Sequence, residues 1–136
     1  MLSEKVEKVL NEQIQLESFS SQLYLAMASW AERSGYEGTA NFLYDHSDEE
    51  RQHMLRLFHY VNYRGGQAHV GAIEAPAQDY DSVQDIFEQI LEHEVYISQK
   101  INESVIDIEN VGEVNCIDQN HIKEEGNTIV EENNEK

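Results

Sequence analysis

The stretch SVQDIFEQILEHEVYISQKINESVIDIE (82–109) contains the cleanest helical pattern in the chain. Ser82, with Asp85 three residues later, resembles a capping box in which Asp takes the place of Glu. Apolar residues then recur every three or four positions, which is typical of one buried face of an α-helix: Val83, Phe87, Ile90, Ile97, Ile101, Val105 and Ile108. We therefore predict a helix over residues 82–109.

Two similar patterns precede this segment. Apolar steps of three and four residues predict a helix over residues 3–33, with Ser3 as its N-cap. A second apolar stripe predicts a helix over residues 38–64, which ends at a pair of glycines. Because the turn between these helices is short, we expect them to be antiparallel.

The remaining segments are less regular. Residues 65–81 have neither a helical nor a strand period and contain the only proline, Pro76, so we expect a long crossover. The pattern weakens after Gly112, which predicts a fourth helix that is short or irregular within residues 113–133, and no fifth helix. The expected fold is an all-α, four-helix bundle that forms a single domain over residues 1–136.

Composition excludes several classes of function. The 136 residues carry 9 Lys and Arg against 27 Asp and Glu, a net charge of −18, which argues against a nucleic-acid or anionic-membrane surface. No apolar stretch is long enough to span a bilayer, and the first residues lack the pattern of a signal peptide, so we expect a cytoplasmic protein. Cys116 is the only cysteine, so a metal would have to be bound by carboxylates and histidines.

Two glutamates interrupt apolar stripes. Glu94 lies between Ile90 and Ile97 in the third predicted helix, and it is the sharper case. Glu17 lies in the same way in the first helix, seven residues before Tyr24. A buried carboxylate costs several kcal/mol unless it is paired, protonated or bound to a metal. The alternative is that each side chain lies at a packing edge and reaches solvent.

The predicted second helix carries Glu50 and His53 three residues apart, which places them side by side on one face. Such a pair, with single glutamates from neighbouring helices, is the layout of a di-iron carboxylate site. Iron accepts carboxylate and imidazole ligands, and two adjacent ferrous ions can each give one electron to dioxygen. A Glu-x-x-His pair also arises by chance in a chain with six histidines and many glutamates, so the conjunction of Glu17, Glu50 with His53, and Glu94 supports the hypothesis.

Neighbouring polar residues have less specific interpretations. Tyr24 lies one heptad beyond Glu17 and could hydrogen-bond a bridging ligand or act as a nearby redox side chain. His46 fits a partly buried neutral imidazole, with a supporting donor to the site as the alternative. His93 is predicted to face solvent, because it is rotated about 100° from Glu94 on an ideal helix. Glu49 fits a surface charge or an accessory metal ligand.

Three segments together resemble the bacterial non-haem ferritins, helix for helix. These are NEQIQLESFSSQLYLAMASW (11–30), EGTANFLYDHSDEERQHMLRLFHYV (37–61) and LEHEVYISQKINE (91–103), within a resemblance that covers residues 3–107. The resemblance implies a cytoplasmic ferroxidase that oxidises ferrous iron with dioxygen or peroxide. It also implies a homo-oligomer, a 24-subunit shell that stores ferric mineral.

The resemblance also implies roles for individual residues. Glu17, Glu50 and His53 would hold the first iron, with Glu50 bridging, and Glu94 would hold the second. Tyr24 matches the tyrosine beside the family's ferroxidase centre. Glu49 matches a ligand of a third, accessory iron site.

The C-terminal region departs from the family pattern. The usual Gln-x-x-Glu pair of the fourth helix is not found. Glu125 is the best candidate for the missing ligand of the second iron, and Glu124 is the next best. The absence of two paired Glu-x-x-His motifs argues against a haem-bearing bacterioferritin, and the absence of Cys pairs argues against a rubrerythrin. The alternative to an iron-storage ferritin is a ferritin-like helical assembly or partner-binding protein that lacks a complete second iron site.

Overall fold

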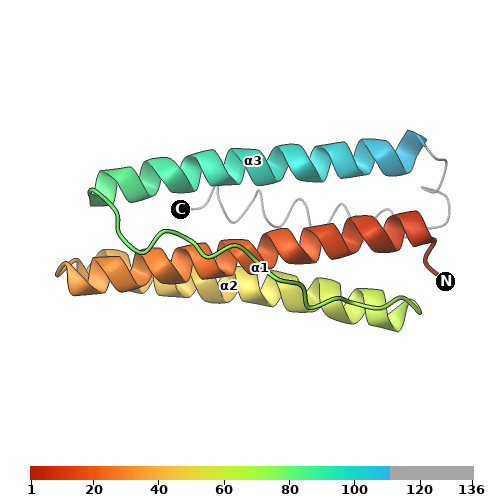
Figure 1. The fold of residues 1–136 in the computed structure, drawn as a ribbon, viewed down its shortest axis with the longest axis horizontal. Helices are drawn as coiled ribbons and strands as arrows, with labels where there is room; N and C mark the ends of the chain where they lie inside the picture. Colours follow the sequence, from red (N-terminus) through yellow and green to blue (C-terminus); the bar gives the residue numbers. More distant parts are fainter. Residues whose placement is uncertain (111–136) are drawn as a thin grey trace. The chain divides into compact units, whose positions relative to one another are not determined.

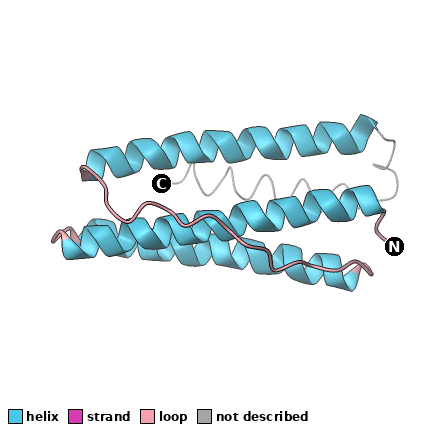
Figure 2. Cartoon of the chain, in the orientation of Figure 1, coloured by secondary structure: helices cyan, strands magenta, loops and turns pink. Residues whose placement is uncertain are grey.

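The computed structural model describes residues 1–110, with side chains described up to residue 106. It contains three long α-helices: α1 (Glu4–Arg33), α2 (Glu37–Tyr63) and α3 (Val83–Asn110). Within these residues there is no strand, as Figure 2 shows. The predicted all-α fold and its three long helices are confirmed. The predicted fourth helix, within residues 113–133, and the expected absence of a fifth lie outside the described residues.

α1 and α2 end in the same way. The glycine that follows each C-cap, Gly35 or Gly65, has φ of +86°. After α1, the N–H groups of Gly35 and Tyr36 donate to the carbonyl oxygens of Glu32 and Ala31, at 3.2 and 2.8 Å. The same pair of bonds follows α2, and this is the Schellman arrangement, which needs a left-handed residue and therefore favours glycine. The stop at Gly35 keeps the turn between α1 and α2 short, and the stop at Gly65 ends α2 where the crossover begins.

α1 and α2 pack along their lengths, side by side in Figure 1. Three alanines in the core, Ala28, Ala31 and Ala40, are at most 2% exposed, and their small side chains allow the helices to approach closely. Larger side chains fill the space around them: Leu23, Tyr24, Met27, Leu43, Tyr80, Ile86 and Ile90. The core therefore draws on both helices, the crossover and the start of α3.

The crossover, residues 64–82, follows α1 from its first turns to its last (Figure 1). Asn11 Nδ2 donates to the carbonyl oxygen of Gln67 at 2.9 Å, and Gln15 Nε2 donates to that of Ala72 at 2.6 Å. At the other end of α1, Arg33 Nη2 donates to the carbonyl oxygen of Gln78 at 3.0 Å. The predicted long crossover is confirmed, and polar side chains of α1 satisfy backbone groups that no helix or sheet pairs.

α3 begins where the crossover ends, beside the last turn of α1. Ser82 Oγ accepts from Asp85 N at 3.0 Å, and Asp85 Oδ2 accepts from Asp81 N at 3.1 Å, which is close to the predicted capping box. The apolar stripe differs from the prediction, because Ile86 is fully buried whereas Phe87 is 43% exposed. The helix is rotated so that Ile86, Ile90 and Ile97 face the core.

The chain forms two compact units, Met1–Ile97 and Ser98–Lys136. The first unit contains α1, α2, the crossover and the first half of α3. In the described part of the second unit, Ser104 Oγ donates to the carbonyl oxygen of Lys100 at 2.9 Å. None of the helices described has the length and apolar character that a membrane-crossing segment requires.

The turn after α1 allows a direct test of the Schellman stop. An added Cβ meets no atom within 4 Å at Gly35 or at Gly38, which lies inside α2, so only the backbone distinguishes them. Gly35→Ala forces alanine to a positive φ and is expected to lower the free energy of unfolding by about 1 kcal/mol. Gly38→Ala is expected to raise it by up to about 1 kcal/mol through helix propensity. Urea unfolding followed by circular dichroism measures both, and equal effects would contradict the assignment.

Candidate metal centre

A reciprocal pair of serine hydrogen bonds joins α1 to α2 at the level of the site. Ser21 Oγ donates to the carbonyl oxygen of Ser47 at 2.9 Å, and Ser47 Oγ donates to that of Ser21 at 2.7 Å. Both side chains are small, so the helix backbones approach each other here. The side chains one turn away on each helix, Glu17 and Glu50, are therefore directed into the same space.

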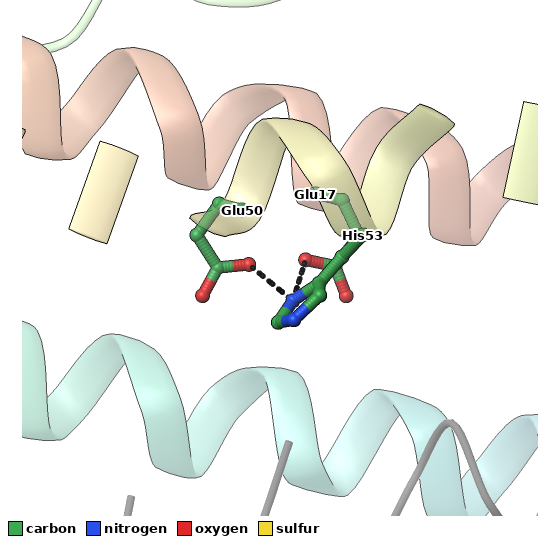
Figure 3. Close-up of side chains that lie close together, drawn as sticks. All are labelled: Glu17, Glu50 and His53. Carbon is green, nitrogen blue, oxygen red and sulfur yellow. Dashed lines mark ion pairs between the residues drawn. The ribbon is translucent and has the colours of Figure 1, made fainter. Parts of the chain in front are cut away.

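Glu17, Glu50 and His53 form the central cluster of the site (Figure 3). Their ligand atoms all lie within 4.8 Å of one another. His53 Nδ1 is 3.5 Å from Glu50 Oε2 and 3.9 Å from Glu17 Oε2. Glu17 comes from α1, and the other two side chains come from successive turns of α2. Two carboxylates and one imidazole thus converge from two helices.

The electrostatics of this cluster favour a cation. Glu17 is 1% exposed, and Gln13 Nε2 donates to its Oε1 at 3.0 Å. Its other oxygen, Oε2, is buried with no hydrogen-bond partner among residues 1–106. Burial raises the pKa of Glu17 well above its ordinary value, and the neighbouring Glu50 raises it further, against the lowering effect of His53. A divalent ion would favour the ionised carboxylate and occupy the position that Oε2 faces.

Glu94 reaches the site from α3. Its side chain is 28% exposed, and its Oε1 lies 3.7 Å from Nε2 of His46 on α2. The sequence pattern made Glu94 the sharpest candidate for a buried carboxylate, but Glu17 is much more deeply buried. The difference follows from the rotation of α3, which turns Ile86, Ile90 and Ile97 inward and leaves Glu94 at the edge of that face.

Tyr24 is the aromatic residue at the centre of the unit. It is 1% exposed, and its ring meets that of His46 edge-on at 5.1 Å. Burial raises the pKa of its hydroxyl, and the charges of Glu50, Glu94 and Glu17 raise it further. The phenol is therefore held in its protonated form close to carboxylates from all three helices.

His93 does not face solvent, so that prediction was wrong. Its Nε2 lies 2.7 Å from Ser20 Oγ on α1, and its ring packs at 5.6 Å from Phe19 and 6.2 Å from Tyr24. Burial lowers the pKa of His93, and Glu94 opposes this effect. Because α3 packs against α1 as well as α2, two consecutive residues, His93 and Glu94, both face helices.

The other candidate residues lie around the central cluster. His46 is buried, as the sequence suggested, and its Nδ1 lies 3.5 Å from Oε2 of Glu49. Glu49 has a half-exposed side chain, which fits the surface charge that the sequence suggested for it. Asp45 and Asp48, on the same helix, are exposed. Glu125 lies outside the described residues. Sequence reasoning missed the contacts of His46 with two carboxylates, although its spacing of four residues from Glu50 was a usable signal.

Known proteins share this arrangement of helices and sequence. Residues 7–118 match the family model for the ferritin-like domain. A "probable bacterial non-heme ferritin-like protein" of Haemophilus influenzae is 52% identical over 105 residues, which are 77% of this chain and 64% of that protein. The "bacterial non-heme ferritin" of Escherichia coli O6:H1 is 41% identical over 103 residues, 76% of this chain and 62% of that protein. The matched region therefore spans less than two thirds of these relatives.

Solved structures agree with the sequence matches. A Chlorobium tepidum ferritin superposes with a TM-score of 0.84 and 31% identity, covering 96% of this chain and 81% of its own. A humanized archaeal ferritin superposes with a TM-score of 0.89 and 32% identity, covering 97% of this chain and 79% of its own. With the family model matching residues 7–118, most of the chain, this protein belongs to the ferritin-like domain family.

Proposed function

We propose that this protein is an iron-storage ferritin that binds ferrous iron at a two-metal centre in each chain and oxidises it to ferric iron. The observation that carries the proposal is the buried cluster of Glu17, Glu50 and His53, whose ligand atoms lie within 4.8 Å of one another. The similarity of the chain to relatives named bacterial non-heme ferritin supports iron as the substrate metal.

In this proposal Glu17, Glu50 and His53 bind the first ferrous ion. Carboxylate oxygen and imidazole nitrogen are suitable ligands for iron of this charge. The ion offsets the cost of burying Glu17 in its ionised form, because it supplies the positive charge that Oε2 lacks. Glu17, which destabilises the metal-free chain when it is ionised, thus becomes a favourable ligand when iron is bound.

Glu94 and Glu50 bind the second ferrous ion, with Glu50 shared between the two positions. A bridging carboxylate suits two metals about 3.5–4 Å apart. Burial and the neighbouring carboxylates keep the Tyr24 hydroxyl protonated. In this proposal that hydroxyl is the hydrogen-bond donor to a ligand that bridges the two ions. The side chains thus orient two reducing ions toward one dioxygen molecule. Glu49 is an accessory ligand on the path of iron, and Glu125 is the proposed further ligand from the C-terminal region.

The redox step then balances with two ferrous ions, one dioxygen molecule and two protons. Two ferrous ions give one electron each to dioxygen, which takes up two protons and leaves as hydrogen peroxide. The ferric ions leave the centre and hydrolyse into mineral. Peroxide in place of dioxygen would serve as the oxidant in the same way, since it also accepts two electrons.

Storage requires a closed assembly, and we propose a homo-oligomeric shell of 24 subunits, as the family resemblance implies. Apolar side chains exposed on one side of α3 support association: Phe87, Leu91 and Val95, at intervals of four residues.

The first test is an anaerobic ferrous titration, followed by admission of oxygen and optical recording of ferric species. We expect a break near two irons per chain and oxidation much faster than in buffer. Glu94→Ala is expected to lose the second equivalent and slow oxidation at least tenfold, because losing a ligand costs at least as much as losing a supporting residue, about 10–100-fold.

The matched control is Glu88→Ala, which removes an exposed carboxylate from the same helix and should leave both quantities unchanged. Unchanged oxidation in Glu94→Ala would contradict the two-metal proposal. A break near one iron in the unaltered protein, with oxidation no faster than in buffer, would favour a ferritin-like assembly without a complete second site.

The pKa of Glu17 predicts how metal-free stability depends on pH. Because folding raises this pKa, the folded chain binds more protons, and its stability falls as pH rises from about 4.5 through the folded pKa. Glu17→Gln removes this loss and is expected to stabilise the metal-free chain by about 1–3 kcal/mol at pH 7, and by less at pH 5.

Chemical unfolding in the presence of a chelator, at both pH values, measures this difference. Glu12→Gln is the control, since it removes an exposed carboxylate from the same helix and should stabilise the chain far less than Glu17→Gln at pH 7. A Glu17→Gln protein that is less stable than the unaltered chain at pH 7 would show that the carboxylate is already compensated without metal.

The assembly is tested by mass. Light scattering coupled to size exclusion should give the mass of twenty-four chains of 15.7 kDa each. Leu91→Glu places a charge in the exposed apolar row and should reduce the assembled fraction, whereas Glu88→Gln should not. A monomer at micromolar concentration would contradict the shell.

A further inference from the structure

His46 lies between two carboxylates that come from different helices. Its Nδ1 is 3.5 Å from Oε2 of Glu49, one turn further along α2, and its Nε2 is 3.7 Å from Oε1 of Glu94 on α3. The imidazole is 5% exposed, whereas the side chains of Glu49 and Glu94 are 39% and 28% exposed. Each ring nitrogen therefore faces one carboxylate.

Two aromatic rings set the plane of this imidazole. Phe42 stacks on it at 5.1 Å with 23° between the planes, and Tyr24 meets it edge-on at 5.1 Å with 67° between the planes. Because the ring is packed on both sides, it is held with Nε2 toward Glu94. Such a side chain is oriented before any ligand arrives.

A carboxylate that accepts from one imidazole nitrogen fixes the tautomer of the ring. When Glu49 accepts from Nδ1–H, the lone pair of Nε2 points at Glu94. A lone pair and a carboxylate repel each other unless a proton or a metal cation lies between them. Carboxylate, imidazole and metal in that order is a recurrent arrangement in metal sites.

The gap between the two atoms has a suitable width. Ligand atoms each about 2.0–2.2 Å from one metal ion, at an angle between about 90° and 120°, lie roughly 2.8–3.8 Å apart. The distance of 3.7 Å between His46 Nε2 and Glu94 Oε1 falls at the upper end of this range. Only a small closure would bring both atoms onto one ion.

We propose that His46 is a ligand of the second metal position, where its Nε2 binds the same ion as Glu94 and Glu49 orients its ring. The inference rests on the proposed two-metal function and names a ligand for its second position. His46, Glu50 and His53 lie at spacings of four and three residues, hence on one face of α2. Each ion would thus receive one imidazole from α2, and Glu50 lies between the two histidines in the sequence.

Zinc is the probe, since it does not react with oxygen and binds the same ligand types. Metal-free full-length protein is titrated with zinc against a chromophoric chelator, which counts only the tight sites. We expect two zinc ions per chain for the unaltered protein and one for His46→Gln. His59→Gln removes an exposed histidine from the same helix and should retain both.

A second variant tests the orientation of the ring without removing it. Glu49→Gln is expected to weaken only the second zinc, by about 10–100-fold, the usual cost of losing a group that orients a ligand. His46→Gln should weaken it more. Circular dichroism of both variants checks that the helices form, and if His46→Gln does not fold, Glu49→Gln and the spectroscopy below decide the question.

X-ray absorption on the unaltered protein loaded with two zinc ions counts the imidazoles directly. One imidazole per zinc is expected; one imidazole for every two zinc ions would overturn the inference, because only His53 would then be bound. Two tight zinc ions of unchanged affinity in His46→Gln would also overturn it.

The failure of this inference is distinguishable from the failure of the proposed function. If the function is wrong, the unaltered protein binds no zinc at the Glu17 cluster and does not accelerate iron oxidation. If only the inference is wrong, the unaltered protein does both, and His46→Gln behaves like His59→Gln. A single tight zinc ion in the unaltered protein would also overturn the inference, since no second position would then exist.

Discussion

An ionised carboxylate at the position of Glu17 costs several kcal/mol unless donors or a positive charge compensate it. Gln13 provides one donor, and the second oxygen has no hydrogen-bond partner among the described side chains. The metal-free chain therefore retains a group whose charge is unfavourable in place. Such a residue is explained most simply by a cation that binds there, and the neighbouring Glu50 and His53 are of the types that bind one.

The packing of α1 on α2 makes this burial possible. The Schellman stop at Gly35 turns the chain back at once, and the alanines of the core and the serine pair let the two helices approach closely. Close approach shields Glu17 from solvent, so its exposed fraction is 1%. The same contacts that stabilise the helix pair thus create the electrostatic demand that a metal ion would meet in the proposed function.

α3 contributes in a different way. The crossover is bound along α1 by side-chain hydrogen bonds, so α3 starts beside the last turn of α1 and runs antiparallel to it. Because α3 runs in this direction, His93 contacts Ser20 on α1 and Glu94 contacts His46 on α2. The proposed two-metal function depends on that second contact, because the cluster of Glu17, Glu50 and His53 offers ligands for one ion.

The sequence by itself determined the helices and the residues that share a face within each helix. Glu50 and His53 follow from a spacing of three residues, and Glu17 from its position in an apolar stripe, since both are properties of a single helix. Only the tertiary structure decided the exposure of Glu94 and Phe87, the burial of His93 and the place of His46 between two carboxylates. Helical periodicity orders side chains around an axis, but the rotation of that axis against its neighbours comes from packing between segments far apart in the chain.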